Sequence, residues 1–151
     1  MTRIWAAGHV LQIGEDVNNV HVAVTAERLS VDVVQQLVRG DGDGAVCCFI
    51  GHVRDMSLGR SVTRVDYEAY AEMAEREMHI IGVRTLEESG ARSIAMHHRV
   101  GALAVGEVAV VVAVASAHRD EAFSGCRQAI DGIKSTVPIW KREHAADGVR
   151  W

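Results

Sequence analysis

The chain has 151 residues, 48% of them hydrophobic, which fits one domain that is large enough to bury a core. Charged residues make up 24%, close to the globular average, so the chain as a whole is not expected to be disordered. The net charge is −4, which argues against a general nucleic-acid binder because such proteins are usually basic.

Cysteine usage and hydropathy bear on the compartment. The three cysteines are an odd number, and the adjacent Cys47 and Cys48 would point to opposite faces of a strand and so would not pair easily. We therefore expect a reducing, cytoplasmic location. No apolar run reaches the roughly 18 residues of a membrane span, so no membrane partner is expected. Residues 1–19 make a poor signal peptide, and we expect an N-terminal extension followed by one domain over residues 20–151.

Hydrophobic patterning predicts strands in the first half of the chain. Alternation of apolar and polar residues predicts strands at 20–25 and 62–69. The nearly continuous apolar run at 45–53 predicts a central strand that is covered on both faces. Gly51 within that run indicates a bulge or a close backbone approach.

The second half of the chain adds a predicted hairpin. Strands are expected at 93–100 and 107–116, and the second of them is long and β-branched. Gly101 and Gly106 bracket a short connection between the two strands, which suggests that they form a hairpin.

Three helices are predicted between these strands. Ser30 is placed to cap a short helix, and a second helix is expected from about residue 70 to 88, ending at Gly90. The apolar faces of these two helices are expected to hold Val34, Leu37 and Val38 in the first and Ala74, Met78 and Ile81 in the second. With a third helix described next, the element order indicates a mixed α+β arrangement rather than a doubly wound parallel sheet.

The stretch from residue 116 to 142 concentrates the candidate chemistry. Its helix is expected to bury a face formed by Phe123, Cys126, Ile130 and Ile133. His118 and Arg119 lie at the predicted N-terminus, a favourable place for an anion, and Lys134 lies near the other end. Ser135, Thr136 and Pro138 are expected to stop the helix, and Trp140, Lys141 and Arg142 follow. These cations, with Arg54 from the end of the 45–53 strand, are predicted to surround an anionic substrate.

Other interpretations of single residues remain open. Arg54 is either a residue at the rim of the sheet or part of a site. The carboxylates of residues 40–44 suggest a metal loop, but a flexible turn is favoured because no calcium-loop spacing follows. His97 and His98 would point to opposite faces of a strand, and no other zinc motif occurs, so no metal site is expected.

Nucleophilic chemistry by the obvious candidates is disfavoured. Ser116, His118 and Asp120 are alternate residues at a strand end, which does not build a relay whose parts converge from separate elements. Cys126 lies on the predicted apolar stripe and is interpreted as an inert core thiol. Lys134 and Lys141 remain, because a partly desolvated amine serves as a general acid or base or as a nucleophile.

Five segments together resemble the MoaE family, the large, catalytic subunit of molybdopterin synthase. They are GAVCCFIGHVRDMSLGR, VDYEAYAEMAE, HHRVGALAVGEVAVVVAVASAHRDEAF, IKSTVPIWKRE and DGVRW. The resemblance covers residues 20–151 without a large gap, and the SAHR segment and the K-x(3)-P-x-W-K run are its specific motifs.

The resemblance implies a fold, a reaction and partners. The implied fold is an α/β hammerhead with an additional antiparallel β-sheet. Such enzymes install two dithiolene sulfurs on cyclic pyranopterin monophosphate, also called precursor Z, and so form molybdopterin. The sulfur comes from the C-terminal thiocarboxylate of a small ubiquitin-like partner of the MoaD type. The assembly is a heterotetramer around a homodimer of the catalytic subunit, and the transfer uses no cofactor or metal.

The resemblance also implies site residues, carried over position by position. Lys134 and Lys141 match the catalytic lysines of the family. The implied substrate-binding residues are His52, Val53, Arg54, His118, Arg119, Arg142 and Glu143. Whether His118 and Arg119 serve their own subunit or a neighbour is left open by the sequence.

Two other classes of function stay as alternatives to the enzyme. One is a non-catalytic binding module for a ubiquitin-like tail or a phosphorylated ligand, and the other is a structural dimer partner in a sulfur-relay complex. The presence of both Lys134 and Lys141 favours the enzyme, because a binding module would have no need to keep both.

Overall fold

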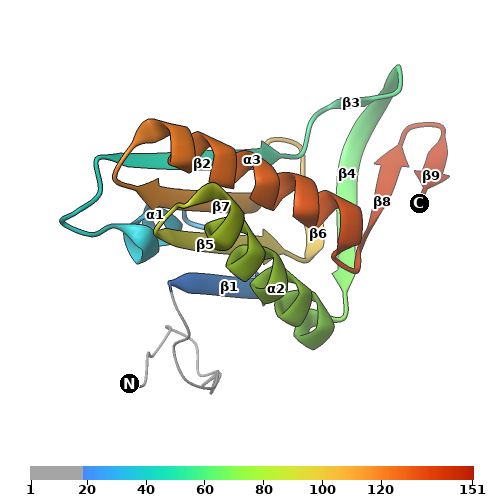
Figure 1. Cartoon of the computed structure of the whole chain (residues 1–151). Helices are drawn as coiled ribbons and strands as arrows, with labels where there is room; N and C mark the ends of the chain where they lie inside the picture. Colours follow the sequence, from blue (N-terminus) through green and yellow to red (C-terminus); the bar gives the residue numbers. More distant parts are fainter. Residues whose placement is uncertain (1–18) are drawn as a thin grey trace.

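The computed structural model describes residues 19–151, and its first sheet forms the centre of the molecule (Figure 1). Strand β1 pairs parallel with β5, whereas β5 with β7 and β7 with β2 pair antiparallel. Across the sheet the order is β1 (Val20–Thr25), β5 (Ser93–Arg99), β7 (Val108–Ser116) and β2 (Ala45–His52). Most of the predicted extension lies outside the described residues, so the predicted division into extension and domain stays a prediction.

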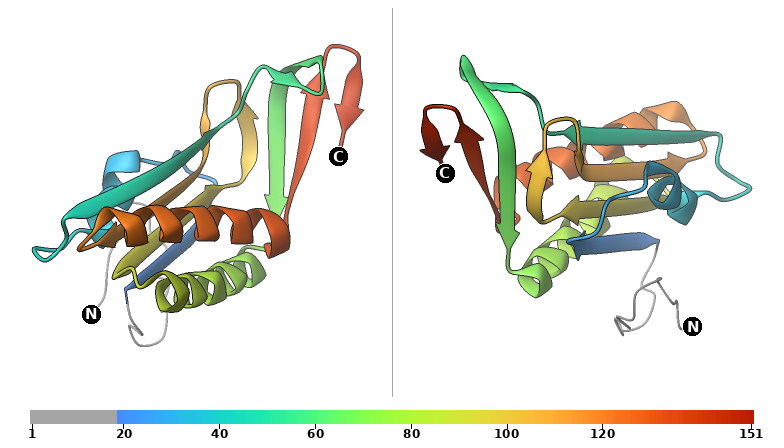
Figure 2. Two further views of the ribbon diagram at one scale, coloured as in Figure 1. Left: turned by 45° about the horizontal axis from the view of Figure 1, so that its top comes forward. Right: turned by 180° about the vertical axis from the view of Figure 1, so that it is seen from behind.

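Three helices cover the two faces of this sheet (Figure 2). Helices α2 (Ala71–Ser89) and α3 (Arg119–Thr136) pack on one face, and α1 (Val31–Val38) packs on the other. None of the helices in the described part of the chain combines the length and the apolar character needed to cross a bilayer.

Strand β7 supplies both halves of the core. Because successive side chains of a strand point to opposite faces, Val112 and Val114 pack under α2 and α3, whereas Val111 and Ala113 pack under α1. All four are fully buried. The long β-branched run that predicted a buried strand therefore does form one, and the helices are anchored to it.

A second, antiparallel sheet stands at one end of the first and crosses the direction of its strands (Figure 1). Its strands in order are β3 (Met56–Ser57), β4 (Arg60–Ala69), β8 (Ile139–Ala145) and β9 (Gly148–Arg150), and the short β6 (Gly101–Ala104) also pairs with β4. A small apolar cluster around Val53, Val65 and Leu103 packs at the base of this sheet. The predicted α+β arrangement with an additional antiparallel sheet is confirmed.

Several local predictions are confirmed. The Ser30 side chain accepts a hydrogen bond from the Val33 amide at 3.3 Å and so caps α1. Gly90 ends α2 in the left-handed conformation, with φ of 74°. At Gly51 the pairing of β2 with β7 shifts register, and an added Cβ would lie 2.6 Å from a methyl carbon of Val110. Both the bulge and the close approach predicted there therefore occur.

The prediction of a central strand at 45–53 is wrong. Strand β2 pairs only with β7 and is an edge strand of the first sheet. Its apolar run arises because α3 covers Cys47 and Phe49 on one face while Val46 and Cys48 face the α1 side. Burial on both faces thus gave a continuous apolar pattern without a strand on each side.

Helix α3 differs from its prediction in two places. Phe123 is 64% exposed, because the buried stripe runs through Ala122 and Cys126 instead. The helix also continues through Ser135 and Thr136, whose hydroxyls donate to the carbonyl oxygens of Asp131 and Gly132, one turn earlier. The hydroxyls thus bond back onto the helix instead of ending it, and the helix stops only before Pro138.

Candidate active site

Strand β8 carries the central residues of the candidate site on two opposite faces. Lys141 and Glu143 lie opposite Tyr67 and Val65 of β4, whose side chains belong to the apolar cluster at the base of the sheet. We call this the inner face. Arg142, which lies between them in sequence, points away from it to the outer face.

On the inner face, Lys141 is held by one carboxylate. Its Nζ donates to Oε1 of Glu143 at 2.9 Å. The Lys141 side chain is 56% exposed, whereas that of Glu143 is only 19% exposed. The hydrogen bond from Lys141 lowers the pKa of Glu143, outweighing the opposing effect of burial, and Ser57 and Arg150 lower this pKa further. An ionised carboxylate therefore orients an ammonium group that is itself open to solvent.

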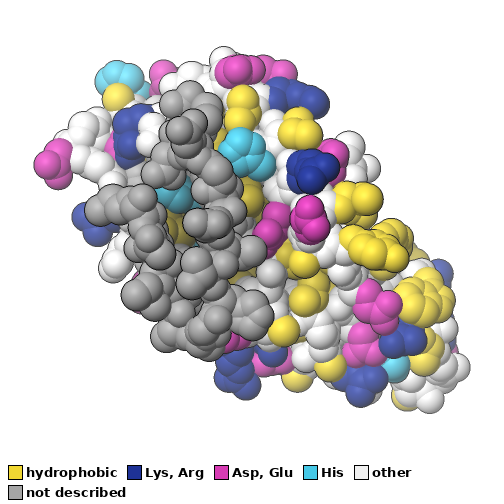
Figure 3. Space-filling model, turned by 90° about the horizontal axis from the view of Figure 1, so that it is seen from below, with side chains coloured by type: hydrophobic (Ala, Val, Ile, Leu, Met, Phe, Trp, Pro, Cys, Tyr) yellow, Lys and Arg dark blue, Asp and Glu magenta, His cyan; other side chains and the backbone are white. Residues whose placement is uncertain are grey.

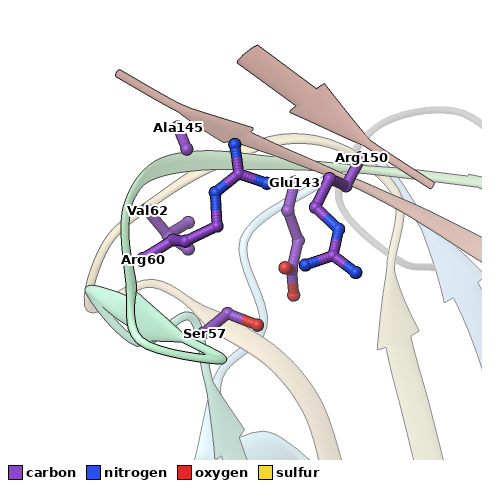
Figure 4. Close-up of a pocket in the computed structure, with 6 residues that line it drawn as sticks. All are labelled: Ser57, Arg60, Val62, Glu143, Ala145 and Arg150. Carbon is purple, nitrogen blue, oxygen red and sulfur yellow. The ribbon is translucent and has the colours of Figure 1, made fainter. Parts of the chain in front are cut away.

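The Glu143 carboxylate lies in a small hollow that is closed by neighbouring strands (Figure 4). The hollow is lined by Ser57, Arg60, Val62, Glu143, Ala145 and Arg150, which come from β3, β4, β8 and β9. Arg60 is already committed, because its Nε donates to a carboxylate oxygen of Asp147 at 2.9 Å. The hollow therefore leaves Arg150 and Ser57 as the polar neighbours that face Glu143.

Arg142 takes part in a separate network on the outer face. Its guanidinium is 3.4 Å from a carboxylate oxygen of both Asp66 and Glu68, and it stacks over the ring of Trp151 at 4.7 Å. Burial raises the pKa of Asp66, but hydrogen bonds from His144 and Arg64 outweigh it and leave this pKa below its ordinary value. Arg142 and Lys141 are thus adjacent in sequence and not brought together by the fold.

The outer face also carries an aromatic pair. Tyr70 and Trp140 are both exposed and meet edge to face with ring centroids 6.4 Å apart. Trp140 is therefore directed away from Lys141, although it is the preceding residue.

The two ends of α3 hold the remaining predicted cations. His118 is the N-cap residue and Arg119 the first helical residue, and both are exposed. Lys134 is exposed in the last turn. The helix has 18 residues, so its ends are about 27 Å apart. A single copy of the chain therefore does not bring His118 and Arg119 together with Lys134.

The predicted residues at the end of β2 lie beside the second sheet. Val53 is buried in the cluster that contains Val65, the residue opposite Glu143, and its amide and carbonyl bond to Glu107 and Gly106 at 3.0 and 2.7 Å. His52 and Arg54 on either side of it are exposed. Val53 thus anchors the segment that carries Arg54 beside β4, where the Val62 amide donates to the Asp55 carbonyl oxygen at 2.7 Å.

Both lysines of the sequence lie on two consecutive elements, Lys134 in the last turn of α3 and Lys141 in β8. Lys134 and Lys141 are the two lysines among 16 basic residues, and the other basic residues are all arginines. An arginine keeps its proton under all ordinary conditions, whereas a lysine amine is able to release one. The side chains capable of amine chemistry are thus confined to the end of α3 and the inner face of β8.

The buried histidines and cysteines do not form a competing site. Within residues 19–151 no group of three or more possible metal ligands is found. His98 packs edge to face on Tyr67 at 5.2 Å, and burial lowers the pKa of His97 to about 4. Cys126 is buried in the core, as predicted, and this burial, with Cys47 nearby, raises the pKa of its thiol to about 12.

Sequence reasoning missed the residues that surround Glu143. Ser57, Arg150 and Tyr67 were not singled out, because each meets the site through strand pairing with β4 or β8. The weak available signal was the alternation around Tyr67, which placed that side chain on the same face as Val65.

Comparison with known proteins identifies the family. The model of the family described as MoaE protein matches residues 24–136. Molybdopterin synthase catalytic subunit 1 of Mycobacterium tuberculosis is 43% identical over 129 residues, covering 85% of this chain and 87% of that protein. The molybdopterin synthase catalytic subunit of Bos taurus is 40% identical over 136 residues, covering 86% and 72%.

Solved structures agree with these relatives. The crystal structure of molybdopterin synthase from Staphylococcus aureus superimposes with a TM-score of 0.82 at 35% identity, covering 85% of this chain and 94% of that chain. The fold and these relatives thus define a chain of the molybdopterin biosynthesis class. The chain belongs to the MoaE family, which confirms the resemblance seen in the sequence.

Proposed function

We propose that this chain is the catalytic subunit of a molybdopterin synthase, a sulfurtransferase of molybdenum cofactor biosynthesis. The relatives that carry this name match most of the chain at about 40% identity, which supports the proposal. The observation on which it rests most is the placement of the two lysines at the end of α3 and on the inner face of β8. In this proposal Lys134 and Lys141 are the catalytic residues.

The proposed reactants are anionic, and the basic residues suit them. Cyclic pyranopterin monophosphate carries a phosphate, and the MoaD-type partner carries a thiocarboxylate at its C-terminus. Arg54, which is exposed beyond the end of β2, is suited to bind phosphate oxygens in bidentate fashion. Lys134 and Lys141 guide the sulfur and move protons as the cyclic phosphate opens. Glu143 serves this site by holding Lys141.

The proposed assembly is a homodimer that forms the core of a heterotetramer with two copies of the sulfur carrier. The separation of about 27 Å between the ends of α3 supports a shared site. His118 and Arg119 would reach substrate bound at Lys134 only from a second copy of the chain. Contact of His52, Val53 and Arg142 with substrate stays a prediction, and for Arg142 it requires a ligand that reaches the outer face.

A dimer of two different inactive variants tests the shared site. Arg119→Ala and Lys134→Ala proteins, each inactive alone, are mixed under conditions that exchange subunits. Restored activity is expected, because one of the two sites in a mixed dimer then keeps both residues. Activity that stays absent in verified mixed dimers contradicts the shared site.

Three further features bear on the setting of the enzyme. The cysteines at 47, 48 and 126 are free thiols, which supports the proposed cytoplasmic location. On the visible part of the face in Figure 3, acidic and basic side chains are interspersed with hydrophobic ones. This distribution and the net charge of −4 suit small anionic reactants and a protein partner better than a nucleic acid.

Reconstitution tests the proposed function directly. The full chain is mixed with a thiocarboxylated MoaD-type partner and cyclic pyranopterin monophosphate, and molybdopterin is sought by mass spectrometry. We expect product with the thiocarboxylated partner and none when the partner ends in an ordinary carboxylate. Binding of both reactants without product would favour the non-catalytic binding module.

A further inference from the structure

The Glu143 carboxylate has polar neighbours on strands from both sides of β8. Arg150 of β9 is the residue directly opposite Glu143 in the antiparallel pairing. Ser57 comes from β3, on the far side of β4. Figure 4 shows the carboxylate, the Arg150 guanidinium and the Ser57 hydroxyl directed into one hollow. The carboxylate that binds Lys141 therefore shares this hollow with a cation and a hydroxyl.

We propose that Arg150 is a positioning residue that, together with Ser57, fixes the Glu143 carboxylate in the orientation that binds the Lys141 ammonium. This inference rests on the proposed function, in which Lys141 acts on substrate. Arg150 itself acts only through Glu143 and is not assigned a contact with the reactants. The assignment gives the three-residue strand β9 a role in the chemistry of the site.

The charges around Glu143 support this arrangement. Lys141 and Arg150 provide two positive charges for one carboxylate, and the Arg60 charge in the same hollow is compensated by Asp147. Tyr67 is a further titratable neighbour, whose pKa is raised by burial and by the negative charge of Glu143. The charge of Arg150 also lowers the pKa of Asp147. Ser57 and the charge of Arg150 thus both favour the ionised form of the carboxylate that accepts the hydrogen bond from Lys141.

Loose positioning would be costly at such a site. A glutamate on a strand has several rotamers, and both it and Lys141 must be fixed for the amine to lie in one place. Displacing a catalytic group by about 1 Å is enough to lower a rate roughly 100-fold. Arg150 acts only through Glu143, so its removal is expected to lower the rate less, by about tenfold.

The test compares Arg150→Gln, Arg150→Lys and the neutral control Val149→Ala in the reconstituted complex. For Arg150→Gln we expect kcat/KM to fall about tenfold. We also expect the acid limb of the pH–rate profile to move to higher pH, because the carboxylate loses a positive neighbour and takes up a proton more easily. Arg150→Lys restores the charge and should return the acid limb of the pH–rate profile to its wild-type position. Val149→Ala should match the wild type, because the Val149 side chain is exposed on β9.

A double variant separates positioning from a general loss of structure. In a Glu143→Gln background, adding Arg150→Gln should cause no further loss, because the residue through which Arg150 acts is already gone. Losses that multiply in the double variant would overturn the proposal. So would an Arg150→Gln protein with wild-type rate and pH profile.

A readout without turnover keeps this inference distinct from the proposed function. The Glu143 carboxyl is titrated by carbon NMR in the wild type, in Arg150→Gln and in Ser57→Ala. We expect its pKa to rise in both variants, and an unchanged titration in both overturns the inference. If the wild type makes no molybdopterin, the proposed function fails. The titration still shows whether Arg150 and Ser57 act on the Glu143 carboxylate. Should Arg150→Gln fail to fold, Ser57→Ala supplies the decision.

Discussion

The two sheets of the molecule are built on opposite principles. In the first sheet, β7 is buried along almost its whole length and carries side chains that pack under helices on both faces. In the second sheet, β8 has no fully buried residue and carries consecutive charged side chains that pair with β4 and with one another. The first sheet therefore supplies most of the stability, and the second presents reactive groups whose positions are set by ion pairs.

This comparison predicts that activity and stability respond to different substitutions. A change on the inner face of the second sheet should lower the rate without changing the unfolding temperature. A change under the helices of the first sheet should lower the unfolding temperature without changing the rate per folded molecule.

The largest effect is expected for Lys141→Ala. General acid–base catalysis contributes about 100- to 10,000-fold, so kcat should fall by a factor in that range. The unfolding temperature should change little, because the ammonium is more than half exposed and makes one ion pair. The measurements are steady-state rates and thermal unfolding. The control Arg127→Ala removes an exposed cation of α3 and should keep the wild-type rate, and a Lys141→Ala enzyme with an unchanged rate would contradict the proposed role.

Met96→Ala in β5 is expected to lower stability without changing the rate. Met96 is fully buried in the cluster under α2 and α3, so truncation should lower the free energy of unfolding by about 2–5 kcal/mol. The rate per folded molecule should stay at the wild-type value at temperatures below unfolding. Urea denaturation measures the loss. Met73→Ala on the exposed side of α2 is the matched control and should change stability by less than about 0.5 kcal/mol.

His97, one of two buried histidines in β5, gives stability a pH dependence. Burial, with His21 nearby, lowers the pKa of His97 from 6.5 to about 4, so between these values the unfolded chain binds more protons than the folded one. Above about pH 6.5, His97 therefore does not lower the free energy of unfolding. As the pH drops toward 4, the free energy of unfolding falls by up to about 3 kcal/mol. Urea unfolding across this range should show a smaller slope for His97→Asn than for the wild type. Equal slopes would contradict the assignment to His97.

The same contrast explains how far the sequence predicts the fold. Apolar periodicity is a local property, so it located β1, β5, β7 and the helices of the first sheet. It did not reveal that β2 is an edge strand, because burial by helices and burial by neighbouring strands leave the same apolar pattern. The exposure of Phe123 likewise depends on which side of α3 meets the sheet.

For the candidate site, sequence patterns located residues but not their faces. The charged run of β8 has no apolar period, and only its pairing with β4 places Lys141 opposite Tyr67 and Arg142 opposite Asp66. The involvement of Ser57 and Arg150 depends on contacts between strands that are far apart in sequence. Such contacts are set by register, which residue types alone do not specify at exposed strands.

The smallest effect is expected on the outer face of the second sheet. Arg142→Ala removes contacts with Asp66, Glu68 and Trp151, but the side chain is 33% exposed, so the free energy of unfolding should fall by only about 1 kcal/mol. Arg64→Ala is the matched control, because it also removes one ion pair from Asp66 and is not assigned to the site. Denaturation of both variants measures the losses, which should be similar, and a several-fold larger loss for Arg142→Ala would contradict this.

The KM values of the same two variants then decide the role of the outer face. A rise in KM for Arg142→Ala alone would show that this face meets substrate, as the family resemblance implies. The two variants are comparable because Asp66 keeps His144 as a partner in both. Equal KM values would therefore mean that Arg142 only holds β8 against β4. Of two adjacent residues on one strand, Lys141 would then serve catalysis on the inner face and Arg142 would stabilise the sheet on the outer face.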